Sequence, residues 1–283
     1  MCGSHNRRVR RGSRAWYVAS GVWTGYRHID TAQIYDTEPS VGVAFRASGL
    51  PREEVFITTK LPWHHPKYVA RSFDESLRNL GLDYVDLYLM HFPQTVAYPS
   101  ETKQQPRELT IVDTLTFNET WAELERIHAS GRARAIGVSN FSIKTLEQLF
   151  KTAKIVPAVN QVEMHPYLAQ TELLEYCRAK GIVVTAYSPS GHEVVRSDPT
   201  IIALAKKYSV TPTQIILAWH VARGVAAVPK SADPARQKEN ITLPALSAED
   251  VVSITALDRN ERIVNKFGPD GKLYGWTAEQ YGW

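Results

Sequence analysis

The chain has few cysteines: only Cys2 and Cys177 occur among its 283 residues. Two cysteines are too few for a disulfide framework, and these two do not form the closely spaced pair of a zinc site. Cys177 falls inside a segment of helical periodicity, where a buried and inert thiol is expected. We therefore expect no metal site and, by default, a reducing cytoplasmic location.

Long apolar runs are missing as well. The sequence contains no apolar run of about 18 residues, the length that spans a bilayer, so we expect no transmembrane helix and no membrane partner. Hydrophobic residues make up 43% and charged residues 22% of the chain, an ordinary balance for a globular protein. The length suits one large α/β barrel or two smaller domains.

Acidic residues are absent from the first 24 positions, which contain instead five clustered arginines, Arg7, Arg8, Arg10, Arg11 and Arg14. Without these five, the formal net charge of +4 becomes −1. Because the rest of the chain is nearly neutral, it lacks the broad basic surface of a nucleic-acid-binding protein, and no nucleic-acid partner is expected. The arginine-rich start is compatible with a short interaction arm or an organellar presequence.

From residue 26 onward, short apolar runs alternate with longer amphipathic segments. The short runs are continuous rather than alternating in hydrophobicity, which indicates strands buried on both faces. Between them lie segments of helical period, several of which end at a glycine suited to a left-handed cap. This order predicts a parallel sheet, which an eighth strand would close into a barrel. The seven predicted strands are 26–32, 55–61, 85–91, 133–139, 158–164, 183–189 and 226–230, and examples of predicted helices are 67–80, 118–129, 171–180 and 213–223.

Every predicted strand ends in, or is followed by, a polar residue unsuited to a hydrophobic core. In a β/α barrel the carboxyl ends of the strands meet on one face, where active sites assemble. We therefore expect these residues to form one site. They are Asp30, Lys60, His91, Ser139 with Asn140, Gln161, Tyr187 and Lys230.

Asp30, Tyr35, Lys60 and His91 together suit the reduction of a carbonyl group. That reaction needs a hydride donor and a proton donor for the developing alkoxide. A phenol has a pKa of about 10, and a nearby ammonium is expected to lower the pKa of Tyr35. Asp30 would keep Lys60 charged and oriented, and His91 would donate a hydrogen bond to the carbonyl oxygen.

These residues stand in motifs that resemble the aldo-keto reductase family. GYRHIDTAQIY, residues 25–35, resembles the family signature, while ITTKL (57–61) and LYLMH (87–91) resemble the strands that carry its catalytic lysine and histidine. The resemblance covers about residues 25–262 and implies a (β/α)8 TIM-type barrel with a nicotinamide cofactor across its active face. It points in particular to the branch of fungal-type aldehyde reductases, glycerol dehydrogenases and pentose reductases.

The resemblance also implies a site for the nicotinamide. Ser139 and Asn140, in GVSNF, would bind the carboxamide, and Gln161 would contact the same amide from the other side. Tyr187 would stack on the nicotinamide ring, and Ser188, the next residue, is also a candidate cofactor-binding residue.

The segment from 228 to 240 resembles the adenine end of the same site. Lys230, Ser231 and Arg236 offer two cations and a hydroxyl for a 2′-phosphate, which favours NADP(H). Glu239 and Asn240 would contact the adenine. No Gly-x-Gly-x-x-Gly motif follows a strand, so a Rossmann domain is not the expected route to the cofactor.

Trp63, His64 and Phe92 follow catalytic strand ends and are candidates for the substrate pocket, against the alternative of simple packing. His64 and His65 are adjacent and have no acid or cysteine at ligand spacing, so we do not expect them to bind a metal. Segments 94–112, 190–197 and 263–283 show no clear element and are interpreted as active-face loops or a tail.

Residues 1–24 depart from the family pattern of a β-hairpin plug, a first strand and a first helix. The first βα unit is therefore predicted to be missing or degenerate, through a truncated or misassembled start or a replacement strand at 14–22. We divide the chain into an atypical segment 1–24, a barrel 25–262 and a tail 263–283 over the active face. An open seven-stranded sheet would leave two edges unpaired, so poor folding or weak activity is expected.

The leading hypothesis is an NADP(H)-dependent oxidoreductase that reduces an aldehyde or ketone to an alcohol, or catalyses the reverse. Its partner would be a small molecule, and the protein would be a monomer or weak homodimer. The alternative is a catalytically weak or inactive NADP(H)-binding barrel with a regulatory or redox-sensing role. All four catalytic residues favour the first hypothesis, whereas the atypical first 24 residues favour the second.

Overall fold

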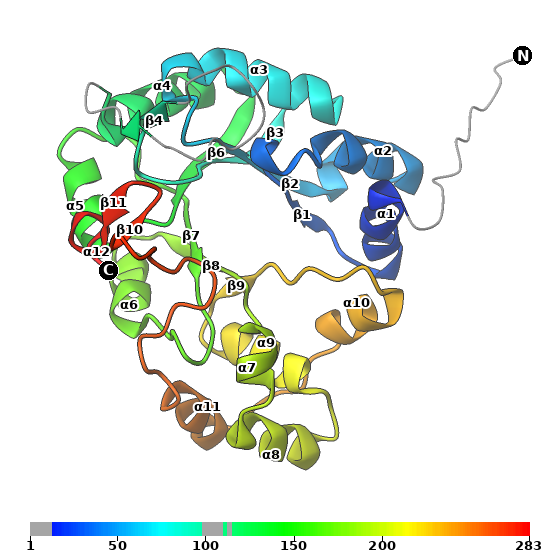
Figure 1. Ribbon diagram of the computed structural model, residues 1–283. Helices are drawn as coiled ribbons and strands as arrows, with labels where there is room; N and C mark the ends of the chain where they lie inside the picture. The colour runs from blue at the N-terminus through cyan, green and yellow to red at the C-terminus, as the bar shows by residue number, and fades with distance from the viewer. Residues whose placement is uncertain (1–12, 98–109, 112–114) are drawn as a thin grey trace, which may run out of the picture.

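The computed structural model describes residues 13–97, 110–111 and 115–283. A curled sheet of seven parallel strands lies at the centre, with helices around its outside (Figure 1). The neighbouring strands in this sheet are also consecutive along the chain, as in an α/β barrel of the TIM type, so the predicted fold class is confirmed. The strands, in order across the sheet, are β1 (His28–Asp30), β2 (Phe56–Leu61), β3 (Val85–Met90), β6 (Ala133–Ser139), β7 (Val159–Glu163), β8 (Val183–Tyr187) and β9 (Ala226–Ala227).

The core explains the uninterrupted hydrophobicity of the predicted strands. All six residues of β3 are buried, because the sheet is covered by side chains on both faces. On the outer side Phe73 packs on Tyr88, with ring centroids 4.7 Å apart. Strands also approach closely at Gly137, where a Cβ would lie 2.6 Å from the carbonyl oxygen of Val159.

Helices connect the strands much as the periodicity predicts. Gly81, predicted as a left-handed cap, follows α3 (Val69–Leu80) with φ +65°, and its N–H donates to the carbonyl of Leu77 at 2.8 Å. Gly131, Gly181 and Gly224 also have positive φ. The helices around the sheet include α2 (Glu38–Ser48), α3 (Val69–Leu80), α4 (Phe117–Ala129), α5 (Ile143–Phe150), α6 (Thr171–Ala179), α8 (Pro199–Tyr208), α9 (Pro212–Ala222), α10 (Pro234–Ile241) and α11 (Ala248–Thr255).

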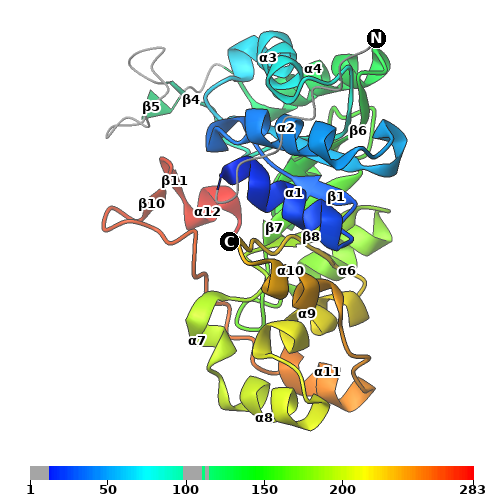
Figure 2. The same cartoon turned by 90° about the vertical axis from the view of Figure 1, so that its right-hand side faces the viewer.

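The segment before β1 is a helix, α1 (Arg14–Thr24), so the interpretation of 14–22 as a replacement strand is wrong. Ser13 caps this helix by accepting a hydrogen bond from the backbone N–H of Trp16 at 3.2 Å. Ala15, Ala19 and Val22 are buried at spacings of three to four residues, which suits a helical face. The helix packs against α2 and α10 (Figures 1 and 2).

Strands β1 and β9 form the two edges of the sheet. Within the described ranges, no strand pairs with the outer side of either one. The described sheet therefore has the seven predicted strands.

Three segments expected to lack regular elements contain short ones. Segment 190–197 includes α7 (His192–Arg196), and the tail includes the hairpin β10 (Lys272–Leu273) and β11 (Trp276–Thr277), followed by α12 (Ala278–Tyr281). In segment 94–112, β4 (Val96–Ala97) pairs with β5 (Thr110–Ile111), and residues 98–109 and 112 lie outside the described residues. Both short strand pairs project on the same side of the molecule (Figure 2). Strands of two residues are too short to produce a periodic signal in sequence.

Among the described residues, no helix is both long and apolar enough to span a bilayer.

Candidate active site

The ends of β1 and β2 form a buried ion pair. Nζ of Lys60 lies 2.5 Å from Oδ1 of Asp30 and donates a second hydrogen bond to the carbonyl of Thr31 at 2.9 Å. The side chain of Lys60 is fully buried and that of Asp30 is 13% exposed. A charge so far from water requires a partner, and the parallel register of β1 and β2 supplies one.

Tyr35 and His91 complete the group predicted from the sequence. Tyr35 belongs to a short 3-10 helix, Gln33–Tyr35, directly after β1, and His91 follows β3. The phenol oxygen of Tyr35 lies 3.2 Å from Nε2 of His91, and Nζ of Lys60 lies 5.4 Å from the centre of the phenol ring. The structure therefore brings all four predicted catalytic residues together.

The electrostatics of Tyr35 differ from expectation. Burial and the negative charge of Asp30 raise the pKa of Tyr35 above its usual value, whereas the sequence predicted that Lys60 would lower it. That prediction is wrong because the ammonium is already paired with Asp30 at hydrogen-bonding distance, and the carboxylate disfavours a phenolate. Tyr35 is therefore protonated at neutral pH.

His91 is a neutral imidazole at the same pH. Burial, and then the positive charge of Lys60, place the pKa of His91 well below its usual value. Its Nε2 faces the phenol of Tyr35. The site thus presents two uncharged hydrogen-bonding groups beside a buried ion pair.

The residues predicted to bind the nicotinamide are linked to this group by hydrogen bonds. The side-chain amide of Asn140 donates to the carbonyl of His91 at 2.9 Å, and the hydroxyl of Tyr187 donates to Oδ1 of Asn140 at 2.7 Å. Asn140 has φ +66°, a left-handed conformation that asparagine tolerates better than most residues. Ser188, which follows Tyr187, has φ +48°.

Gln161 on β7 and Ser139 on β6 are paired in register on neighbouring strands. Nε2 of Gln161 donates to Oδ2 of Asp30 at 2.7 Å, and Oγ of Ser139 donates to the carbonyl of Gln161 at 2.8 Å. Asp30 thus joins the lysine of β2 to the amide of β7. Both Ser139 and Gln161 are buried.

The residues predicted to contact the adenine end of the cofactor lie after β9 and in α10. Lys230 and Ser231 follow β9, and Arg236, Glu239 and Asn240 belong to α10. Lys230 and Arg236 are exposed, and neither side chain is in an ion pair with any residue in the described part of the chain.

Aromatic rings pack around the buried side chain of His91. The ring of Trp63 lies 5.5 Å from that of His91 and 5.2 Å from that of Phe92. Tyr274, at the turn between β10 and β11, packs on Trp63 at 4.9 Å and on Phe92 at 5.2 Å. Trp63 and Phe92 therefore lie beside His91, one of the four predicted catalytic residues, and their role toward a substrate stays a prediction.

His64 also lies near this aromatic group, 6.4 Å from the ring of Trp63. Burial, and then the neighbouring His65, lower the pKa of His64 to about 3. Its imidazole is therefore uncharged at neutral pH.

Two further residues, Glu163 and Asn265, tie the tail to the site and were missed by sequence reasoning. Glu163 ends β7 and accepts hydrogen bonds from the backbone N–H groups of Ile263, Val264 and Asn265 at 2.6, 3.0 and 3.2 Å. Burial alone would raise the pKa of Glu163, but hydrogen bonds from His165 and these N–H groups lower it to about 2. The amide of Asn265 donates to the hydroxyl of Tyr187. Only the fold shows these roles, because Asn265 stands in a segment without recognisable periodicity.

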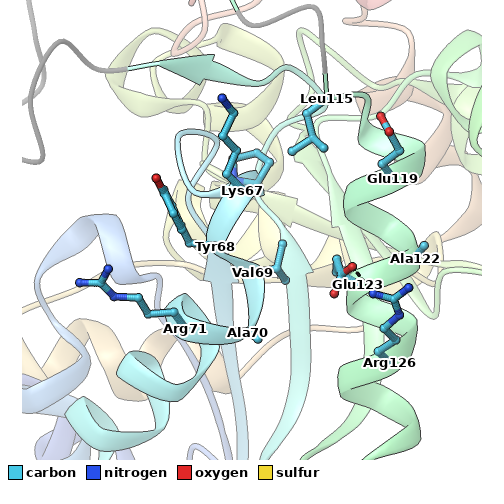
Figure 3. A pocket seen from close by; sticks show the side chains of 11 residues that line it. Lys67, Tyr68, Val69, Ala70, Arg71, Leu115, Glu119, Ala122, Glu123 and Arg126 are labelled. Atoms are coloured by element: carbon cyan, nitrogen blue, oxygen red, sulfur yellow. Dashed lines mark hydrogen bonds and ion pairs between the residues drawn. The ribbon is translucent and has the colours of Figure 1, made fainter.

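A hollow of about 750 Å³ lies elsewhere, between the first turn of α3 and the outer face of α4 (Figure 3). None of the predicted site residues lines it. Its lining is Pro66, Lys67, Tyr68, Val69, Ala70, Arg71, Leu115, Glu119, Ala122, Glu123 and Arg126.

No group of three or more His, Cys, Asp or Glu side chains within residues 13–97, 110–111 and 115–283 is arranged to hold a metal ion.

Comparisons with known proteins agree on one family. The model of the Aldo/keto reductase family matches residues 2–259. Glycerol 2-dehydrogenase (NADP(+)) of Saccharomyces cerevisiae is 44% identical over 260 residues, which cover 86% of this chain and 82% of the relative. Aldo-keto reductase family 1 member A1 of Homo sapiens is 41% identical over 277 residues (90% and 85%), and aldehyde reductase YPR1 of Saccharomyces cerevisiae is 40% identical over 257 residues (86% and 82%).

Proposed function

Because the chain belongs to the aldo/keto reductase family, we propose that it reduces an aldehyde or ketone to an alcohol with NADPH, and catalyses the reverse oxidation with NADP+. One arrangement supports the proposal above all others. The phenol oxygen of Tyr35 lies 3.2 Å from Nε2 of His91, beside the buried pair of Lys60 and Asp30. A carbonyl oxygen placed against these two groups would meet a proton donor and a hydrogen-bonding partner at once.

The residues present suit NADP(H). When bound, the cofactor supplies the hydride that adds to the carbonyl carbon. Ser139, Asn140 and Gln161 offer buried hydroxyl and amide groups for the carboxamide, and Tyr187 offers a ring that its hydrogen bonds hold in place. A separate set, the exposed cations Lys230 and Arg236 with Ser231, suits a 2′-phosphate, and Glu239 and Asn240 would contact the adenine.

Tyr35 is the proton donor in this mechanism. Its raised pKa keeps the phenol protonated, and an alkoxide is a stronger base than a phenolate, so proton transfer to the product oxygen is still favourable. Lys60, whose ammonium lies 5.4 Å from the centre of the phenol ring, would offset only part of the penalty that burial and Asp30 impose on the phenolate that remains. Asp30 holds the lysine in position, and neutral His91 orients the carbonyl oxygen.

The substrate in this proposal is a small carbonyl compound or alcohol. The relatives' names support it, since they describe a glycerol dehydrogenase and an aldehyde reductase. Trp63, Phe92 and Tyr274 would form aromatic walls of the pocket, with His64 at its edge. We further propose that the protein is a cytoplasmic monomer or weak homodimer.

The decisive test is Tyr35→Phe against wild type in an NADPH oxidation assay with a panel of small aldehydes. Loss of the phenol hydroxyl should lower kcat by about 10²- to 10⁴-fold while NADPH still binds, because only the proton donor is removed. Unchanged kcat in this variant would overturn the assignment.

The same assay tests the non-catalytic alternative, which is favoured by the two unpaired sheet edges, β1 and β9, of the described strands. Tight NADPH binding by the wild-type protein, without turnover of any aldehyde, would support a regulatory or redox-sensing barrel instead.

A further inference from the structure

Gln237 is a buried polar residue in a helix that otherwise faces solvent. It is 6% exposed and is the residue of α10 that lies in the interior. A buried amide costs free energy unless its donors and acceptor are satisfied, so an apolar residue would be the simpler choice for packing. The presence of a glutamine here calls for specific partners.

Those partners lie in α1 and in the loop before α10. Oε1 of Gln237 accepts a hydrogen bond from Oγ of Ser20 at 2.8 Å. Nε2 donates to the carbonyl of Tyr17 at 2.9 Å and to the carbonyl of Ser231 at 2.9 Å. One side chain therefore joins α1 to a loop more than 200 residues away in sequence.

The loop that Gln237 holds is the one that carries the candidate phosphate-binding residues. Ser231 is bonded directly through its carbonyl, and Arg236 is the neighbour of Gln237 in the chain. The same regions also meet at Tyr26, just after α1: burial raises the pKa of its phenol, and the side chain of Asn240 in α10 lowers it. Helices α1 and α10 pack side by side (Figures 1 and 2).

We propose that Gln237 is a positioning residue for the 2′-phosphate of NADP(H), and that α1 thereby forms part of the cofactor-binding unit. The inference rests on the proposed function. Lys230 and Arg236 have long, exposed side chains, and ordering them around a phosphate costs conformational entropy. The total cost is smaller when the backbone that carries them is already held in place. Gln237 holds that backbone against α1 before the phosphate arrives. Helix α1 thus contributes to cofactor selectivity.

The test is Gln237→Met, which preserves length and packing but removes all three hydrogen bonds. Dissociation constants are measured by fluorescence titration for NADPH and NADH, and by competition for adenosine 2′,5′-bisphosphate. We expect Kd for NADPH and for the bisphosphate to rise about tenfold, equivalent to ~1.4 kcal/mol, because both carry the 2′-phosphate. Kd for NADH should change less than twofold, and kcat at saturating NADPH should be unchanged.

Two other variants separate positioning from general destabilisation. Of the three hydrogen bonds of Gln237, Ser20→Ala removes only the one to Oε1, together with the bond from Oγ of Ser20 to the carbonyl of Tyr17 inside α1. It should weaken NADPH binding by about twofold to threefold, with no further effect when combined with Gln237→Met. Asn118→Leu is the matched control, since the amide of Asn118 donates to the carbonyls of Gln148 and Leu149 and to the hydroxyl of Thr152, between α4 and α5. It should lower Tm and leave Kd for NADPH as in wild type.

Two results would overturn the inference while leaving the proposed function intact. One is an unchanged Kd for NADPH in both Gln237→Met and Ser20→Ala. The other is an equal rise for NADPH and NADH, which would show that the 2′-phosphate is not involved. Failure of the wild-type protein to bind either NADPH or the bisphosphate would instead refute the proposed function, and the inference with it.

Discussion

Replacing Asp30 with asparagine isolates the physical role of the buried ion pair. The substitution keeps the size of the side chain and an oxygen that can accept a hydrogen bond, but it removes the negative charge. Lys60 would remain fully buried, with Nζ still donating to the carbonyl of Thr31 and no carboxylate at 2.5 Å. We therefore expect Asp30→Asn to destabilise the fold as well as the site.

The magnitude follows from the burial of the lysine. Removing one partner of a buried pair leaves an uncompensated charge and costs about 3–5 kcal/mol, whereas replacing both partners by neutral groups is often close to neutral. The 13% exposure of Asp30 admits some water, so the lower end of that range is expected. The double variant Asp30→Asn with Lys60→Met should recover most of the lost stability, because no unpaired charge remains.

Urea unfolding, followed by tryptophan fluorescence, measures these changes as shifts of the transition midpoint. NADPH turnover is measured in parallel and should be lost in both variants, since both lack the charged lysine–carboxylate pair beside Tyr35. Recovery of stability without recovery of activity would separate the two roles of the pair. An Asp30→Asn protein as stable as wild type, or a double variant no more stable than the single one, would refute the reasoning.

Two other predictions follow from the pKa directions at the site and in the core. Burial and Asp30 raise the pKa of Tyr35, so carbonyl reduction should show no loss of kcat between pH 6 and 9. Alcohol oxidation needs the phenolate, so its rate should increase with rising pH. A reduction rate that falls through neutral pH would contradict this prediction. Burial also lowers the pKa of His91 and, to about 3, that of His220, so both stay neutral in the folded state while the unfolded chain takes up protons below about pH 6.5. Unfolding free energy should therefore fall as pH decreases from 7 to 5, by up to ~2 kcal/mol for each such histidine, and substituting His220 with an uncharged residue should flatten the profile.

The sequence alone was enough to predict the order of the strands and the proximity of Asp30, Tyr35, Lys60 and His91. Strands such as 85–90 are rich in apolar residues because both faces of the sheet are buried, and that signal lies within a few consecutive residues. Asp30, Lys60 and His91 each come at the end of such a run. Parallel strands place their carboxyl ends on one face, so local positions in the sequence were sufficient to predict their proximity.

Tertiary structure decided the features that depend on distant contacts. The direction of the pKa shift at Tyr35 depends on how closely Lys60 pairs with Asp30, which no spacing in the sequence reveals. The roles of Asn265 and Gln237 arise from partners 78 and 217 residues away, Tyr187 and Ser20. Hydrophobic periodicity shows which face of a helix or strand is buried. The environment of a buried polar group, in contrast, is set by the elements that the fold packs against it.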